Sequence, residues 1–544
     1  MRIREYFSIF LFALTFLAMA PAVAFGNNLD IANISLESQS TGNGTWDIEF
    51  DISWDNSWCE SGAQCNGDAG NATNNWDAAW VFAKYSVYSG GVWGPWTHCK
   101  LKTSGHTEPS GSQIDTGTTD GVGMGVFIYR DGAGTGSNNW DNARIVWHYD
   151  ADSVADDALL KVQVFGVEMV HVPEGSFYVG SGGTESGSFT DGSWVSGATI
   201  PFQITSEGAI TIAASVGNLW GTSTSGNNTI GGAGTLPAAF PKGFAPFYMM
   251  KYEVTQKQYV DFLNTLTRDQ QEARVADHAT NSYYSMSGTE YVNYRSGIRN
   301  PASIPAAPGV VTFGCDLDGI TTHNDTKGDG TFNESNDGQW VAANYLSWAD
   351  LAAYADWAAL RPFTELEYEK AARGPDSPSA NVYAWGSASF DGDCPSYGLS
   401  GTTSGQADED VDDNCNLNHT SNTVDGPYRG GIYAKAATTR AQAGAGYYGI
   451  MEFSGNLYER PVSVGEATVG RLFDGTHGNG ALTAAGAADA STWPGTTATG
   501  SGRRGGSWKS GPPVGYRLSY RGLAAGVDST RSSDYGGRLC RTSE

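Results

Sequence analysis

The sequence predicts an α+β protein in which an all-β domain precedes an irregular domain with few helices. Residues 25–165 contain short runs of β-branched and aromatic residues, separated by turn residues and without a helical period. Only three later segments place apolar residues at helical spacing. Glycine is abundant, with 72 among 544 residues, so much of the second domain is expected to consist of ordered loops.

The first residues predict a signal peptide over 1–24. Arg2 and Arg4 give a basic start, residues 7–20 are mostly apolar, and Ala22-Val-Ala24 is a small-x-small cleavage site. The mature chain is then expected to begin at Phe25 and to be secreted, as an extracellular, cell-surface or periplasmic protein. No other apolar stretch is long enough to cross a bilayer, so no membrane span is expected.

Residues 25–165 are predicted to form a β-sandwich-like domain, because short strands recur there between clusters of Gly, Asn, Asp and Ser. The expected strands are residues 31–36, 46–54, 80–88, 125–130, 143–149 and 159–164.

Residues 166–544 are predicted to form the second domain, with Gly-, Ser- and Thr-rich or acidic insertions at 181–240 and 315–340. Thr255 is a plausible N-cap for one helix, and Ser347 is a plausible N-cap for a second that ends near residue 360. Thr364 and Glu367 form a capping box that opens a third helix over 365–372.

The net charge and the cysteines indicate which partners the protein can bind and in which compartment it works. The formal net charge of −26 argues against nucleic acid, because an acidic surface repels phosphates. An exported chain with seven cysteines allows disulfides, and close spacing suggests Cys59–Cys65 and Cys394–Cys415. The odd count leaves at least one thiol free or paired between chains, and spacing alone does not fix the connectivity.

Seven motifs occur in order along the second domain. They are Val172-Pro-Glu-Gly-Ser-Phe-Tyr-Val-Gly-Ser181, Tyr252-Glu-Val-Thr-Gln256, Arg361-Pro-Phe-Thr-Glu-Leu-Glu-Tyr-Glu369 with Ala371-Ala-Arg-Gly374, Tyr383-Ala-Trp-Gly386, Gly449-Ile-Met-Glu-Phe-Ser-Gly-Asn-Leu-Tyr-Glu459, Arg504-Gly-Gly-Ser-Trp508 and Tyr535-Gly-Gly-Arg538. Together they resemble the formylglycine-generating enzyme, or sulfatase-modifying factor, family. The resemblance implies an irregular fold related to C-type lectins. It does not reach the first 140 or so mature residues.

The resemblance does not carry the family's oxidase activity with it. Oxidase members hold copper(I) with two thiolates downstream of the Gly-Gly-Ser motif, a choice that suits a soft metal. The matching positions here are Ser510 and Gly515, and neither side chain supplies a thiolate. We therefore expect no copper and a divergent member without the catalytic cysteine pair. Hydrolysis through Ser510 is not favoured either, because no nucleophile-elbow motif is present.

The resemblance also implies structural calcium, which the family shares apart from its catalysis. One expected site comprises Asn416, Leu417, Asp425 and Pro427, and a second comprises Gly455, Asn456, Leu457 and Glu459. Oxygen donors on glycine-containing turns suit Ca²⁺. A third acidic loop spans residues 315–337 and is a degraded match to a calcium-binding loop, because Lys327 and Asn336 stand where acidic ligands are wanted.

The groove that the family uses for substrate lies beside the Gly-Gly-Ser-Trp segment and the C-terminal loops. Here that region is rich in Trp, Tyr and Arg, the residues that dominate binding hot spots. We also expect about half of its arginines to pair with internal carboxylates such as Glu365, Glu367 and Glu459. The predicted ligand-binding residues are Ser507, Trp508, Ser510, Tyr516, Arg517, Tyr520, Arg521 and Tyr535.

These observations favour a secreted, non-catalytic binding or structural protein that presents a ligand face to an extracellular protein or glycan. The first alternative is an enzyme with non-copper chemistry on the same scaffold. The second is a self-assembling surface or fibre subunit, which the export signal, the Gly- and Asn-rich composition and the odd cysteine count allow.

Overall fold

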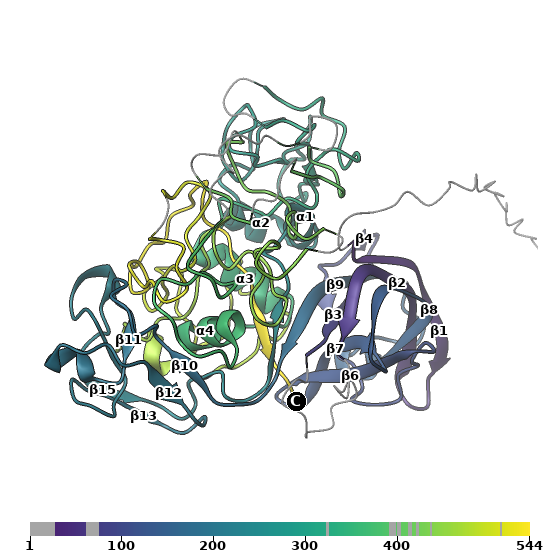
Figure 1. Ribbon diagram of the computed structural model, residues 1–544. Helices are drawn as coiled ribbons and strands as arrows, with labels where there is room; N and C mark the ends of the chain where they lie inside the picture. Colours follow the sequence, from purple (N-terminus) through teal and green to yellow (C-terminus); the bar gives the residue numbers. More distant parts are fainter. Residues whose placement is uncertain are drawn as a thin grey trace, which may run out of the picture.

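The computed structural model describes residues 28–60, 75–321, 326–390, 399, 404–411, 416–419, 424–435, 438–511 and 514–544 (Figure 1). The predicted signal peptide lies outside these residues, as do Cys65, Cys394 and Cys415.

The N-terminal part of the described chain contains two sheets packed face to face. The first has the strand order β1-β2-β8, and the second contains β3, β7 and β6 next to β9. Ile48 and Trp54 of the first sheet share one core cluster with Val81 and Ile128 of the second. The strands are β1 (Asp30–Ser40), β2 (Thr45–Cys59), β3 (Asp77–Ser89), β4 (Val92–Trp93), β5 (Thr97–His98), β6 (Ser112–Thr119), β7 (Val122–Arg130), β8 (Gly134–Trp147) and β9 (Leu160–Val172).

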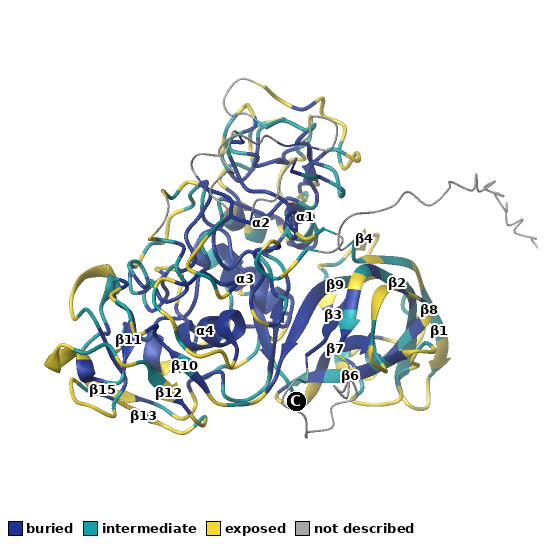
Figure 2. Cartoon of the chain, viewed as in Figure 1, coloured by how far each residue is buried: buried dark blue, intermediate teal, exposed yellow. Residues whose placement is uncertain are grey.

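The second sheet continues into the C-terminal part of the chain. β9 pairs with β3 on one side and with β16 (Phe247–Met250) on the other, and β16 pairs with β19 (Cys540–Thr542). The expected boundary at residue 165 therefore falls inside a strand that both parts share. β3 is buried along most of its length because its two faces pack against different cores (Figure 2).

All six strands expected in the first domain have counterparts, but β6 was not expected. Its sequence, SQIDTGTT, has only one large apolar residue, so apolar alternation gives no signal for it. Pairing with β7 along its length supplies the order that its composition does not predict.

The helices of the second part begin where capping chemistry predicts. α1 (Gln256–Leu263), α3 (Trp348–Trp357) and α4 (Glu365–Arg373) start after Thr255, Ser347 and Thr364, each with a reciprocal capping box. α2 (Arg268–Arg274) was not expected, since its sequence RDQQEAR has no apolar stripe.

Short strands fill the expected insertions. Within and just before residues 181–240 the chain forms β10 (Phe177–Val179), β11 (Phe189–Thr190), β12 (Phe202–Ile204), β13 (Ile210–Ile212), β14 (Trp220–Gly221) and β15 (Gly234–Leu236), and this subregion lies at the far end from the sandwich (Figure 1). β17 (Ile298–Arg299) pairs with β18 (Gly314–Cys315) beside the second insertion.

The described cysteines include one disulfide partner and three free thiols. Cys59 is disulfide-bonded, whereas Cys99, Cys315 and Cys540 are free and buried. The partner of Cys59 therefore lies outside the described residues, where its expected partner Cys65 also lies. None of the described helices is long and apolar enough to cross a membrane.

Candidate functional site

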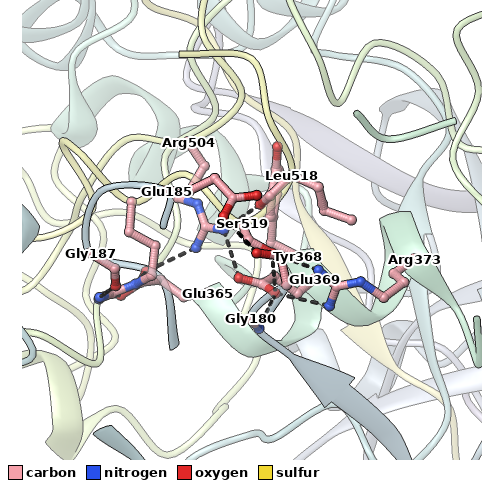
Figure 3. A network of polar contacts seen from close by, with 12 residues as sticks. Gly180, Glu185, Gly187, Glu365, Tyr368, Glu369, Arg373, Arg504, Leu518 and Ser519 are labelled. Carbon is pink, nitrogen blue, oxygen red and sulfur yellow. Dashed lines mark hydrogen bonds and ion pairs between the residues drawn. The ribbon is translucent and has the colours of Figure 1, made fainter. Parts of the chain in front are cut away.

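α4 and the C-terminal loops meet in a fully buried ion network (Figure 3). Arg504 Nη1 lies 3.0 Å from Glu365 Oε2, and its Nη2 lies 2.9 Å from Glu369 Oε1. Both carboxylates come from α4 at positions i and i+4, which places them on one face of the helix. The Arg504 guanidinium also donates to the Leu518 carbonyl at 2.7 Å, which fixes the loop that follows.

Two further arginines complete this network. Arg521 contacts both oxygens of Glu365, at 2.6 and 2.9 Å, and Arg373 Nη1 lies 3.0 Å from Glu369 Oε2. Burial opposes the charge of Glu365, but Arg521 and Arg504 outweigh it and lower the pKa of that carboxyl. The network holds three guanidiniums and two carboxylates, so it ties α4, the segment of Arg504 and the loop of Leu518 and Arg521 together without presenting charge to solvent.

Charged residues of other motifs also form buried ion pairs. Arg538 Nε lies 2.6 Å from Glu459 Oε1, and Arg361 makes a two-point contact with Glu367 at 2.6 and 3.0 Å. The expected pairing with internal carboxylates is thus present for Glu365 and Glu459. Glu367 is paired with an arginine that precedes α4 and not with one from the C-terminal tail.

Ser510, the first of the two positions that a copper pair would use, lies in a cluster of hydroxyl groups. Ser510 Oγ lies 3.1 Å from Ser507 Oγ and 3.1 Å from the Tyr458 hydroxyl. Asp534 Oδ2 accepts from Ser507 Oγ at 3.4 Å. Burial raises the pKa of Tyr458, which makes it a poor base for activating a serine. His477, the histidine nearest to Ser510 in sequence, is engaged with the Thr542 amide at 3.0 Å.

None of the described cysteines replaces the thiolates that are missing at residues 510 and 515. Gly515 has open space where a side chain would begin, since no atom of the described residues lies within 4 Å of the position a Cβ would take. Cys540 is buried, with its sulfur 2.9 Å from Arg361 Nη1, and burial raises its pKa well above the ordinary range. The site therefore offers hydroxyl oxygens, which are poor ligands for soft copper(I).

Comparison with known families identifies the domain that carries these residues. The family described as sulfatase-modifying factor enzyme 1-like domain matches residues 161–543. The chain belongs to the sulfatase-modifying factor enzyme 1-like family. A search of curated proteins finds no match to the chain. The match begins at the first residues of β9, so the family domain includes the strand that joins it to the sandwich.

The structure corrects the predicted ligand face of this family domain. Arg521 is fully buried against Glu365, and the Trp508 indole donates inward to the Ser533 carbonyl at 3.0 Å. Internal hydrogen bonds also hold the buried hydroxyls of Tyr516 and Tyr535. Five of the eight predicted side chains are buried, namely Ser507, Trp508, Tyr516, Arg521 and Tyr535, while Ser510, Arg517 and Tyr520 are half-buried.

One residue that sequence reasoning did not include, Tyr294, lies at this face beside Lys509. The Tyr294 ring packs 5.2 Å from Trp508, and exposed Lys509 lies over the Tyr294 ring at 5.5 Å. Tyr294 comes from a loop between two motifs, so its place beside Trp508 had no sequence signal.

The turn Gly455–Glu459 fits the calcium site expected there only in part. The Asn456 side-chain oxygen already accepts from Asn418 Nδ2 at 3.1 Å and from the Tyr428 amide at 2.8 Å. Arg538 pairs with Glu459 Oε1, whereas Glu459 Oε2 is buried without a hydrogen-bond partner among the described residues. The side chain of Leu457 is buried among apolar residues, and its amide donates to Glu253 at 2.9 Å.

The other expected calcium site fits in part. Asn416 donates its side-chain amide to the Ala441 carbonyl at 2.8 Å. Arg295 donates to the Pro427 carbonyl at 2.6 Å, so this carbonyl already faces a positive charge. Asn416 and Leu417 are buried and Asp425 is half-buried, and their oxygens are of the hard type that calcium prefers.

The acidic insertion brings its carboxylates together more closely. Ligand-type oxygens of Asp316, Asp318 and Asp329 lie within 4.8 Å of one another, as do those of Asp318, Glu334 and Asp337. Burial raises the pKa of Asp337 to about 7. Amides of residues 318 and 334 donate to Asp337, and Arg299 pairs with Asp316, so protein donors already stabilise part of this charge.

Proposed function

We propose that this chain is a secreted, non-catalytic binding protein whose family domain, with a C-type-lectin-like fold, presents a ligand face. The observation that carries the proposal is the replacement of the two thiolate positions of the oxidases by Ser510, in a hydroxyl cluster with Ser507 and Tyr458, and by Gly515. The family motifs are accounted for without catalysis, because their charged residues form internal ion pairs.

The proposed face comprises Ser510, Arg517 and Tyr520 together with Lys509 and Tyr294. Its aromatic and basic character suits an acidic or aromatic group on an extracellular protein or a glycan. The net charge of −26 opposes nucleic acid as the partner.

Structural calcium is part of the proposal at the loop of Asn416, Leu417 and Asp425. Its support is the family resemblance and the hard oxygen donors of these residues. Mass spectrometry of the secreted protein tests the export step, since removal of residues 1–24 predicts an N-terminus at Phe25.

Turnover and binding assays separate the proposal from its alternatives. Supplied with Cu(I) and oxygen, the purified protein is expected to leave a cysteine-containing peptide unmodified. Formation of an aldehyde, or turnover of a small amine, would favour the enzyme alternative. Light scattering with and without calcium tests self-assembly, and large particles would favour the fibre-subunit alternative.

A matched pair of variants tests the face itself. Tyr520→Ala is expected to abolish a hit found on a glycan array or an extracellular-protein array. Tyr88→Ala removes a 40% exposed tyrosine from the sandwich and is expected to leave that hit unchanged. Equal loss in both variants would show that the binding surface lies elsewhere.

A further inference from the structure

A cavity of about 360 Å³ lies between the sandwich and the family domain. The sandwich side is formed by the start of β1, by β3 and by β9, and the family side by α1, α3 and the end of the acidic insertion. Ligand cavities of small molecules fall in this size range. The cavity is separate from the face proposed above, because none of the residues of that face lines it.

Aromatic side chains form the inner wall of the cavity. The Phe165 ring lies 4.9 Å from Trp357 and 5.4 Å from Phe82. The Trp357 indole donates to Thr265 Oγ1 at 2.8 Å, so its polar atom is already satisfied. This wall offers an apolar surface that suits an alkyl or aryl group.

Carboxylates outnumber cations around the same space. Asp30, Glu168, Glu253 and Asp261 line it, together with the ammonium of Lys257. Burial raises the pKa of Glu253 well above its usual range, and its oxygens accept from Asn456 and from the Leu457 amide, so it adds no negative charge to the cavity. Lys257 is paired with Asp261 at 2.6 Å, and Glu168 is paired with Lys251 at 3.6 Å. Asp30 has no ion-pair partner among the described residues, so its negative charge favours a positively charged occupant.

Two aromatic residues lie between this cavity and a smaller recess. Tyr252 and Trp340 are half-buried and line both this cavity and the recess of about 20 Å³ beside it. The Lys251 ammonium already lies 5.7 Å from the centroid of the Tyr252 ring, so Trp340 is the ring that would attract a bound cation through its quadrupole. Arg429 lines the small recess and would repel a cation there, so the positive group is directed toward Asp30 and Asp261.

We propose that this interdomain cavity binds a small organic cation, an ammonium or guanidinium carried on an aryl or alkyl body. The apolar body would lie against Phe165 and Trp357, and the charged group would face Asp30 and Asp261. The site draws residues from the sandwich and from the family domain, so the ligand would bridge them. The proposal does not depend on the function of the C-terminal face.

Calorimetric titration of the full mature chain with three matched probes tests the proposal. The probes are phenethylammonium, phenethyl alcohol and phenylacetate, which share one body and differ in charge. Phenethylammonium is expected to bind at least roughly tenfold more tightly than the alcohol, and to weaken with added salt. Phenylacetate is expected not to bind.

The variant Asp30→Asn/Asp261→Asn is expected to remove the preference for the cation while keeping weak binding of the alcohol. Glu37→Gln, on the same strand as Asp30 but away from the cavity lining, is the control and is expected to change nothing. Equal binding of cation and alcohol to the unmodified chain would overturn the proposal. Binding of none of the three probes, or of neutral sugars in their place, would overturn it as well.

Discussion

Removal of one carboxylate from the buried network is expected to destabilise the protein more than removal of the arginine at its centre. Glu365 and Glu369 face Arg504, Arg521 and Arg373, and all five side chains are at most 3% exposed. Glu365→Gln leaves three guanidiniums and one carboxylate. Arg504→Met leaves two matched pairs, Glu365 with Arg521 and Glu369 with Arg373.

The expected magnitudes follow from the charge left unpaired. Loss of one partner from a buried ion pair costs about 3–5 kcal/mol. Glu365 serves two guanidiniums and also accepts from the Val464 amide at 3.0 Å, so Glu365→Gln is expected at the upper end, about 5 kcal/mol. Arg504→Met is expected at the lower end, about 3 kcal/mol.

Urea unfolding followed by tryptophan fluorescence and circular dichroism measures both effects. Glu290→Gln breaks an exposed pair with Lys327, in which both side chains are about half exposed, and is expected to cost under about 0.5 kcal/mol. A loss below about 1 kcal/mol for Glu365→Gln would refute the reasoning. So would a larger loss for Arg504→Met than for Glu365→Gln.

Three further predictions concern metal and proton binding. The double variant Ser510→Cys/Gly515→Cys is expected to gain affinity for Cu(I), because thiolates suit this metal and Gly515 has room for a side chain. A competition assay with a chromophoric chelator measures this affinity. No gain would show that the two positions do not converge. Burial raises the pKa of Glu452 to about 7, so its folded form holds a proton that the unfolded chain releases near pH 4.5. Its contribution to stability is therefore full below about pH 4.5 and lost as the pH rises through about 7, and melting in chelator should show a slope over this window that Glu452→Gln reduces. A chelator is expected to lower the melting temperature of the unmodified protein, and Asp425→Asn is expected to shrink that drop, whereas an unchanged drop would place the calcium elsewhere.

The sequence predicted those helices and strands that have a clear capping residue or a clear alternation of apolar residues. Thr255, Ser347 and Thr364 mark true helix starts, because each offers its hydroxyl to the amide three residues on. β6 gave no such signal, since its order comes from pairing with β7. α2 also has a capping box, between Thr267 and Gln270, but its sequence has no apolar stripe that would indicate a helix. The continuous sheet through β9 was also beyond prediction, because strand pairing across the expected boundary at 165 leaves no local mark in the sequence.

The sequence predicted which residue types occupy the site, but it did not predict how their side chains are arranged. The replacement of both thiolate positions is visible in the sequence alone. Whether Trp508 or Arg521 faces solvent depends on long-range partners, Ser533 and Glu365, which sequence spacing does not reveal. The aromatic and acidic cavity at the domain junction likewise exists only because β9 brings the sandwich against α1 and α3.

Metal analysis of the purified mature protein, by mass spectrometry before and after chelation, tests the central claim most directly. The central claim is that the family scaffold persists here without its copper chemistry. The account predicts bound calcium and copper well below one per chain, even after incubation with Cu(I). Copper or iron near one per chain, retained through chelation, would contradict it and would mean that the scaffold carries a catalytic metal held by other residues.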